Sequence, residues 1–311
     1  MPIASAPSGF PTLLRDDPSR SRPRELEDGL NFYLYHPLAA RLARLLKPTG
    51  ISPNAVSVFG CFLVWGAAWA YTGLAWPQGV MVGFTLHLLW HVADGADGDL
   101  ARLTGKSSPT GELVDGVCDL AGHIVLYVAL AAMLQNQIGG WAWPLAVAAG
   151  ASHIAQSIHV ETQRRSYLWW AYGVPWLKHA QAAGSARLRR KSWFSITWNW
   201  MAPTYVWMAN ALNPFSARID TAVDTAAHNR RRSAMIRRLA RQASRRSLRF
   251  QKVVGPNPRT IILGASMALG SPLYYFLAET VLLNLALVLS VRHHNVVGRL
   301  LAERLERLGD D

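Results

Sequence analysis

The sequence has little cysteine, little acid and few charges of any kind. Its two cysteines, Cys61 and Cys118, both lie in apolar segments, so we expect no disulfide framework. Only 19 residues are acidic against 32 that are basic, which gives a net charge of +13, and charged residues make up 16% of the chain. Because 50% of the residues are hydrophobic, the chain is too apolar for an ordinary soluble protein and too charged for a bare bundle of membrane spans.

Two further features are absent. The N-terminal region contains no apolar segment of the kind found in signal peptides, so we expect no cleavable signal. No Ser–His or Cys–His arrangement indicates a covalent enzyme intermediate. What is abundant is positive charge, which suits nucleic acid or the anionic face of a membrane. Tryptophan is abundant too, with 13 residues, and it favours the membrane because indole rings collect at bilayer interfaces.

Six apolar segments approach the ~20 residues that cross a bilayer. They cover residues 54–76, 79–103, 120–134, 141–160, 260–278 and 280–298. Almost nothing separates the last two, so we expect them to form a helical hairpin. The segments predict an all-α fold, a polytopic membrane helical bundle of about six transmembrane helices.

The region before the first apolar segment predicts an amphipathic helix. Residues 30–50 alternate apolar and basic side chains at helical spacing, as in helices that lie in the membrane interface. Ser52, Pro53 and Asn54 follow, and they provide a capping residue and a proline for the first turn of the next helix. We therefore expect a break between the interfacial helix and the first span.

A basic insertion, residues 163–252, separates the fourth and fifth apolar segments and holds over half of the Lys and Arg residues. Its end, 228–252, spaces apolar residues among arginines and predicts a basic amphipathic helix. Its middle, 193–212, is rich in Trp and predicts an interfacial or reentrant segment broken by Pro203, with a seventh span as the alternative. Because basic loops mark the cytoplasmic side, we expect the insertion and the N-terminal region to lie in the cytoplasm.

Four aspartates lie where the second apolar segment ends and the third begins. They are Asp94, Asp97, Asp115 and Asp119, and we call them the acidic cluster. Residues three or four apart share one face of a helix, and the connector is short, so two antiparallel helices would bring the four carboxylates together. Like charges at one point repel unless cations intervene. Oxygen ligands favour Mg²⁺ or Mn²⁺, and two such ions support phosphoryl transfer.

Several alternatives compete with this interpretation. The order of the acids does not fit a calcium loop, which needs acids at alternate positions and a Glu at the twelfth. Asp99 and Glu112, which lie between members of the cluster, are interpreted as solvated acids. A cation transporter also carries intramembrane carboxylates, although they are normally scattered through its core. A membrane-tethered nucleic-acid binder that uses residues 228–252 is a third alternative.

The motif around the acidic cluster resembles that of the CDP-alcohol phosphotransferases, also called CDP-alcohol phosphatidyltransferases. These integral membrane enzymes of phospholipid synthesis carry the pattern D-x-x-D-G-x-x-A-R, eight residues, and then G-x-x-x-D-x-x-x-D. The segment from Asp94 to Asp119 meets every fixed position of that pattern. The resemblance implies that the site binds two Mg²⁺ or Mn²⁺ ions through Asp94, Asp97, Asp115 and Asp119.

The resemblance also implies roles for single residues. Asp119 would be the catalytic base that takes the proton of the acceptor hydroxyl. Gly98, Ala101 and Gly111 are small and would leave room for the CDP moiety. Arg102 would contact phosphate or orient a carboxylate, and an arginine at the end of a span is the alternative interpretation.

The implied reaction transfers a phosphate-linked group from a CDP-activated donor to an alcohol acceptor and releases CMP. Arg164 and Arg165 follow the fourth segment, about where relatives that accept inositol phosphate carry arginines for its phosphate. A basic flank of a span is the competing interpretation. The two arginines favour CDP-diacylglycerol as the donor. Residues 104–119 look like the eukaryotic choline and ethanolamine phosphotransferases, and so keep open the transfer of a CDP-linked head group to a lipid alcohol.

The resemblance and the charge pattern also predict the surroundings of the protein. Relatives are commonly homodimers. We expect a multi-pass protein of the bacterial inner membrane whose active site faces the cytoplasm, with anionic membrane lipid and not nucleic acid as a partner. The predicted division of the chain is 1–29 (disordered basic tail), 30–50 (interfacial helix), 51–162 (transmembrane catalytic half), 163–252 (basic insertion), 253–298 (transmembrane hairpin) and 299–311 (C-terminal tail).

Overall fold

The computed structural model describes three stretches of the chain, residues 23–174, 193–226 and 229–310. Within these stretches the secondary structure is helical and no strand occurs, which confirms the predicted all-α fold. Most of the predicted disordered tail lies outside the described residues. The chain divides into two compact units, which we describe separately. Unit 1 comprises Met1–Val64 and Leu86–Gly122, and unit 2 comprises Trp65–Thr85 and His123–Asp311.

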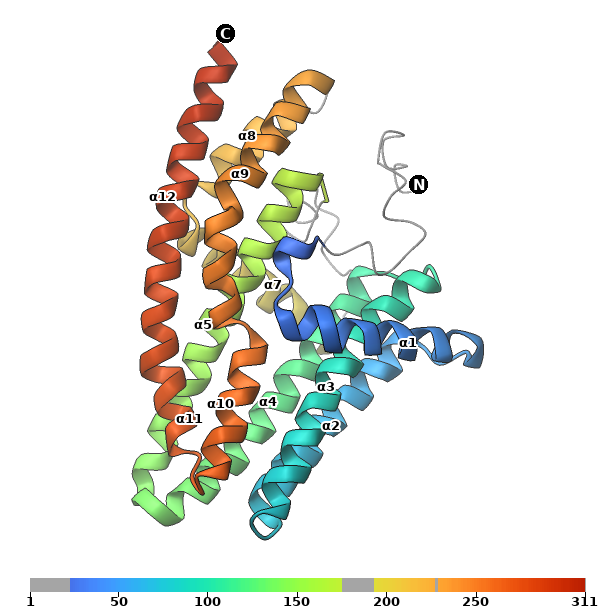
Figure 1. Ribbon diagram of the computed structural model, residues 1–311, viewed down its shortest axis with the longest axis vertical. Coiled ribbons are helices and arrows are strands. Elements are labelled where there is room, and N and C mark those ends of the chain that lie inside the picture. The colour runs from blue at the N-terminus through green and yellow to red at the C-terminus, as the bar shows by residue number, and fades with distance from the viewer. Residues whose placement is uncertain (1–22, 175–192, 227–228, 311) are drawn as a thin grey trace. The chain divides into compact units, whose positions relative to one another are not determined.

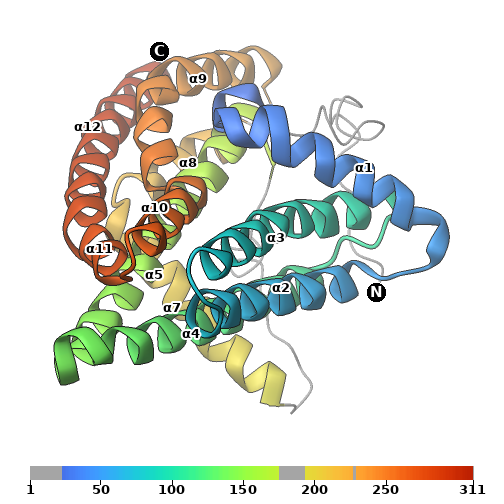
Figure 2. The same ribbon diagram turned by 60° about the horizontal axis from the view of Figure 1, so that its bottom comes forward.

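Unit 1 contains the first helix and the parts of the next three helices that carry the motif. They are α1 (His36–Leu46) and portions of α2 (Pro53–Gly73), α3 (Gln78–Leu103) and α4 (Pro109–Ile138). α2 begins as predicted, with Pro53 as its first residue and the Ser52 hydroxyl accepting from the backbone N–H of Ala55 at 3.2 Å. α2 and α3 lie side by side in both views (Figure 1, Figure 2). Cys61 and Cys118 are free thiols, as expected.

Residues 30–50 are helical, as predicted, with α1 at their centre. The small side chains of Ala39 and Ala43 are fully buried in an apolar cluster with residues of α2 and α3. A Cβ atom on Gly95 of α3 would lie 2.9 Å from the Ala39 Cβ, so glycine permits this close approach of the two helices. Leu45 is exposed, which suits a helix in contact with lipid. The location of α1 in the membrane interface stays a prediction.

Unit 2 is a helical bundle that includes the described part of the basic insertion. From α5 onward its helices are α5 (Ala142–Tyr172), α7 (Trp193–Leu212), α8 (Ser216–Ala226), α9 (Arg230–Val254), α10 (Pro256–Ala268), α11 (Leu273–Leu277), a π-helical turn (Ala278–Leu282) and α12 (Leu283–Asp310). α5, α9 and α12 pack side by side (Figure 1). Together with α8 they bury an apolar core that includes Trp170, Ile219, Ile236 and Leu305.

The basic amphipathic helix predicted at residues 228–252 is confirmed as α9. Asn229 caps it, because its Oδ1 accepts from the backbone N–H groups of Arg231 and Arg232, each at 3.1 Å. Apolar side chains of α9 pack in the bundle core, whereas arginines such as Arg238 are exposed. The helix therefore presents charge outward while much of its apolar face is used in packing against other helices.

Two predictions about the second half of the chain are wrong in detail. Pro203 does not break the segment 193–212, because α7 continues through it. The predicted fifth span, 260–278, is interrupted after α10, where Gly270 adopts a positive φ of 80°. α10 alone has 13 residues, about 20 Å, which is too short for a bilayer core of about 30 Å. The turn lies near Gly270, and the chain is helical at Glu279, where the sequence predicts the hairpin turn.

Three helical stretches among the described residues are long and apolar enough to cross a membrane, by length and composition. They are Pro53–Gly73, Val114–Tyr172 and Leu273–Leu308. The second contains most of α4 and all of α5, which a 3₁₀ turn at Gly139–Trp141 separates. These stretches support a membrane protein. The count of six spans and the predicted domain limits stay predictions.

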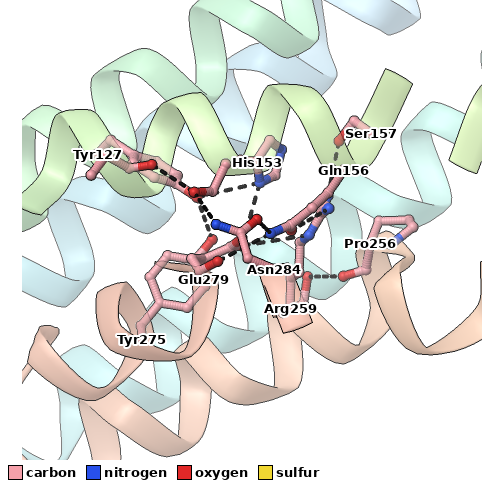
Figure 3. A network of polar contacts seen from close by, with 12 residues as sticks. Tyr127, His153, Gln156, Ser157, Pro256, Arg259, Tyr275, Glu279 and Asn284 are labelled. Atoms are coloured by element: carbon pink, nitrogen blue, oxygen red, sulfur yellow. Dashed lines mark hydrogen bonds and ion pairs between the residues drawn. The ribbon is translucent and has the colours of Figure 1, made fainter. Parts of the chain in front are cut away.

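A buried polar network occupies the interior of unit 2 (Figure 3). Glu279, in the π-helical turn, is fully buried, and its Oε1 lies 3.5 Å from both Arg259 Nε and His153 Nδ1. Gln156 donates to the Glu279 carbonyl at 3.0 Å and to Asn284 Oδ1 at 2.9 Å. Its own Oε1 accepts from Arg259 Nη2 at 2.9 Å. No motif or spacing in the sequence singles out these side chains.

Candidate metal centre

The acidic cluster lies in unit 1, on α3 and α4, as the spacing of the motif predicts. Asp94, Asp115 and Asp119 each offer one carboxylate oxygen, and these oxygens lie within 4.8 Å of one another. Asp97 is 6% exposed, and its carboxyl group hydrogen-bonds with that of Asp115. The structure therefore brings the four acidic side chains of the motif to one place.

The donor set of this place fits hard divalent cations. Its ligand atoms are carboxylate oxygens, which suit Mg²⁺ and Mn²⁺. At a metal–oxygen distance of about 2.1 Å, two opposed ligand oxygens are about 4.2 Å apart. Small side-chain adjustments would therefore bring the three oxygens, now within 4.8 Å of one another, into coordination distance. Two carboxyl groups that hydrogen-bond to each other must share a proton or a cation, so positive charge also fits between Asp97 and Asp115.

Two side chains outside the motif donate hydrogen bonds to the acidic cluster. Ser57 Oγ of α2 donates to Asp97 Oδ2 at 2.5 Å, and Trp90 Nε1 of α3 donates to Asp119 Oδ1 at 3.2 Å. Both donors are buried. The sequence does not mark them, because a serine in the first apolar segment and a tryptophan in the second do not differ in type from ordinary span residues. Only their spatial neighbours identify them.

Asp99 and Arg102 form a pair of their own on α3. Asp99 is 2% exposed and accepts a hydrogen bond from Arg102 Nη2, three residues later. The interpretation of Asp99 as a solvated loop acid is therefore wrong, because its helical position turns the carboxylate toward Arg102. Glu112 is exposed in the first turn of α4, where a negative charge is favourable. The carboxylate that Arg102 contacts is outside the acidic cluster, and the role of Arg102 in binding phosphate or orienting a carboxylate stays a prediction.

The small residues of the motif leave space on α3 and constrain α4. For a Cβ atom added to Gly98, the three nearest atoms belong to the Arg102 guanidinium, at 3.5 Å or more. The neighbour of Gly98 is therefore a flexible side chain. A Cβ on Gly111 would meet Ser108 Oγ at 3.4 Å and Asn54 Oδ1 at 3.6 Å. Ala101 is half-buried. Room for a nucleotide beside these residues stays a prediction.

Arg164 and Arg165 lie on α5 in unit 2, and both have the same carboxylate partner. Arg164 donates from Nε and Nη2 to the two oxygens of Glu161, each at 2.8 Å, and Arg165 Nε donates to Glu161 Oε1 at 2.6 Å. This triad neutralises one of the two positive charges. Binding of an acceptor phosphate by the arginines stays a prediction, and it would compete with Glu161.

Comparison with known proteins identifies one related family. Residues 50–175 match the family model described as CDP-alcohol phosphatidyltransferase. No curated protein and no solved structure matches the chain. The matched range contains the whole acidic cluster together with Ser57 and Trp90. The resemblance inferred from the motif is thereby confirmed by a match that extends well beyond it.

Proposed function

Because residues 50–175 form a CDP-alcohol phosphatidyltransferase domain, whose family carries out CDP-alcohol phosphotransfer in phospholipid synthesis, we propose that this membrane protein uses CDP-diacylglycerol as its donor. The acceptor is a small polar alcohol, and CMP is released. The observation that carries the proposal is the convergence of Asp94, Asp115 and Asp119, from two helices, within 4.8 Å. That arrangement suits the binding of a pyrophosphate through cations.

The acidic cluster would hold two Mg²⁺ or Mn²⁺ ions through its four aspartates. Bound there, the ions would neutralise the pyrophosphate and the charge that develops on the leaving CMP. The all-oxygen donor set supports this choice of metal. The convergence of acidic side chains also favours the binding of cations, because ionised carboxylates at one place repel one another.

Asp119 would act as the base. The acceptor hydroxyl transfers its proton to the Asp119 carboxylate while its oxygen forms a bond to the phosphorus that bears the transferred group. The bond from that phosphorus to the CMP oxygen breaks, and CMP leaves with the electron pair.

The remaining motif residues would position the nucleotide. Gly98, Ala101 and Gly111 would let the cytidine part lie close to the helices, and the flexible border of Gly98 supports this. Arg102 would reach a phosphate only by exchanging Asp99 for it. Such an exchange is open to the Arg102 side chain, which is 38% exposed, but it would leave the buried Asp99 carboxylate without its partner.

A second donor class is kept as an alternative. The segment 104–119 resembles the choline and ethanolamine phosphotransferases, which favours transfer of a CDP-linked head group to a lipid alcohol. The preference for CDP-diacylglycerol rests on Arg164 and Arg165 as ligands for an acceptor phosphate. Their contacts with Glu161 make that role conditional on a partner exchange.

The proposed setting is the bacterial inner membrane, with the acidic cluster on the cytoplasmic face. The basic residues of the insertion support this orientation under the positive-inside rule. The exposed arginines of α9 would contact anionic lipid, and the active form would be a homodimer, as is common in the family.

The test is CMP release by the purified protein. The protein is incubated with Mg²⁺ and either CDP-diacylglycerol or CDP-choline, each with a panel of acceptors: inositol phosphate, glycerol phosphate, serine and diacylglycerol. The proposal predicts CMP only with CDP-diacylglycerol and a polar acceptor. CMP release only from CDP-choline with diacylglycerol would establish the alternative. Transport of a cation without CMP release from either donor would contradict both.

A further inference from the structure

Ser57 and Trp90 lie outside the motif, and each donates a hydrogen bond to a carboxylate of the acidic cluster. Ser57 reaches Asp97 from α2 at 2.5 Å, and Trp90 reaches Asp119 of α4 from α3 at 3.2 Å. Each bond thus joins one helix to the next, and each ends on a carboxylate of the cluster. The two contacts tie together the three helices from which the site is built.

We propose that Ser57 and Trp90 are positioning residues that fix the orientation of the Asp97 and Asp119 carboxylates for cation binding. The proposal rests on the function proposed above, because it concerns the same site. Neither residue would touch the substrate. Each acts on the cation through the carboxylate that it holds.

The chemistry of the two donors supports this role. An indole N–H donates and cannot accept, so Trp90 holds Oδ1 of Asp119 in place as a fixed donor. The Ser57 hydroxyl lies closer to Asp97 Oδ2, at 2.5 Å, than to the carbonyl of Pro53, at 3.4 Å, and a hydroxyl has one proton to donate. One oxygen of each of these two carboxylates is therefore held by a donor from a neighbouring helix.

The packing of α2 shows that the Trp90 ring has little freedom to leave this position. Gly60 lies one turn after Ser57, and a Cβ atom on Gly60 would lie 3.4 Å from Trp90 Cδ1. Val64 lies one turn further along α2, and its Cβ would be 3.3 Å from a Cβ atom added to Gly122 of α4. One face of α2, formed by Ser57, Gly60 and Val64, therefore packs against both helices that carry the acids.

The experiment measures Mn²⁺ affinity in the absence of substrate, by the EPR signal of free Mn²⁺ during titration of the purified protein. Ser57→Val and Ser57→Thr have nearly the same shape, and only the second keeps a hydroxyl. Loss of a partner that orients a metal ligand typically costs 10–100-fold in affinity. We expect Ser57→Val and Trp90→Phe to raise the Mn²⁺ dissociation constant by roughly that factor, and Ser57→Thr to remain near wild type.

Two control variants separate positioning from general damage to the helices. Thr72→Ala removes a hydroxyl from α2 that bonds only to the Ala68 carbonyl of its own helix, and Trp69→Phe changes an exposed tryptophan. Both should leave Mn²⁺ affinity unchanged. If Ser57→Val and Ser57→Thr bind Mn²⁺ equally, or if Trp90→Phe binds like wild type, the proposal is overturned.

The readout also distinguishes this proposal from the proposed function. If the wild-type protein binds Mn²⁺ but releases no CMP from any donor, the enzymatic proposal fails, and the two variant series still test the positioning role. Should Trp90→Phe not fold, as judged by size-exclusion chromatography, the Ser57→Val and Ser57→Thr pair decides the matter, because valine is tolerated in spans.

Discussion

The acidic cluster of unit 1 and the buried network of unit 2 both gather titratable side chains on helices, but they balance charge in different ways. The cluster contains four carboxylates of one sign, with a hydroxyl and an indole as donors. In the network, Glu279 faces Arg259 and His153, and an amide joins the members.

This difference indicates that the acidic cluster is a binding site and that the buried network stabilises the fold. The like charges of the acidic cluster are balanced only when a cation binds from outside the protein, so we expect the cluster to function only with bound cations. A network with charges of both signs balances its charge within the protein, and removal of one partner leaves a buried charge unbalanced. Substitution should therefore reduce activity in the first region and stability in the second.

The largest effect is expected for Asp97→Asn. An amide is a poor ligand for Mg²⁺, so turnover should fall by well over tenfold, which is ~1.4 kcal/mol of transition-state stabilisation. The thermal unfolding temperature should not fall, because the change removes one of four like charges. CMP release and thermal unfolding are measured on the same sample, with Asp224→Asn, an exposed aspartate of α8, as the control. More than about a tenth of wild-type activity would exclude Asp97 as a central ligand.

Asp119→Asn separates metal binding from proton transfer. If Asp119 is also the base, saturating Mg²⁺ should leave a deficit on the order of 10²–10⁴-fold, because an amide does not take up the hydroxyl proton. The measurement is the rate of CMP release as a function of Mg²⁺ concentration. Full recovery at high Mg²⁺ would show that Asp119 is a ligand only.

Arg259→Met should lower the stability of the protein, which tests the role assigned to the buried network. Loss of one partner from a buried ion pair costs about 3–5 kcal/mol, and Arg259 and Glu279 are 4% and 0% exposed. The double variant Arg259→Met with Glu279→Gln should regain part of that loss. The control is Arg218→Met, whose ion pair with Glu306 is half exposed, 49% and 50%, and should contribute about 1 kcal/mol or less. Equal melting temperatures for Arg259→Met and Arg218→Met would contradict a structural role for the network.

The smallest effect per residue is expected for the exposed arginines of α9. Each basic residue near an anionic surface contributes about 1 kcal/mol, so changing Arg238, Arg245 and Arg249 to Gln should weaken the preference for anionic lipid. Spin-labelled phosphatidylglycerol and phosphatidylcholine are compared on the reconstituted protein. The matched control replaces Arg299, Arg304 and Arg307 of α12 with Gln. An equal loss from both triple variants would assign the effect to net charge and not to α9.

The sequence was sufficient for features that depend on neighbours along the helix. The start of α2, the helical nature of residues 30–50, the course of α9 and the pairing of acids on α3 and α4 follow from capping, periodicity and spacing. Gly270 also carried a usable signal, because Gly-Ser-Pro at residues 270–272 is typical of a turn. The continuous apolar run from 260 to 278 outweighed that signal in the prediction.

Features that depend on contacts between distant segments were beyond the sequence. Asp99 lies beside the cluster in sequence, and only its packing reveals that it is buried against Arg102. Ser57 and Trp90 are ordinary span residues until their distance to a carboxylate is known. Glu279 has partners on α5, more than a hundred residues earlier in the sequence, and on nearby α10. Hydrophobic periodicity therefore cannot predict the network.

The central claim, that the acidic cluster works only with bound cations, is tested most directly by metal removal. Wild-type protein is passed through excess EDTA, and CMP release is measured before and after Mg²⁺ or Mn²⁺ is restored. If this claim is correct, CMP release stops in EDTA and recovers fully with either ion. CMP release that continues at full rate in EDTA would contradict it.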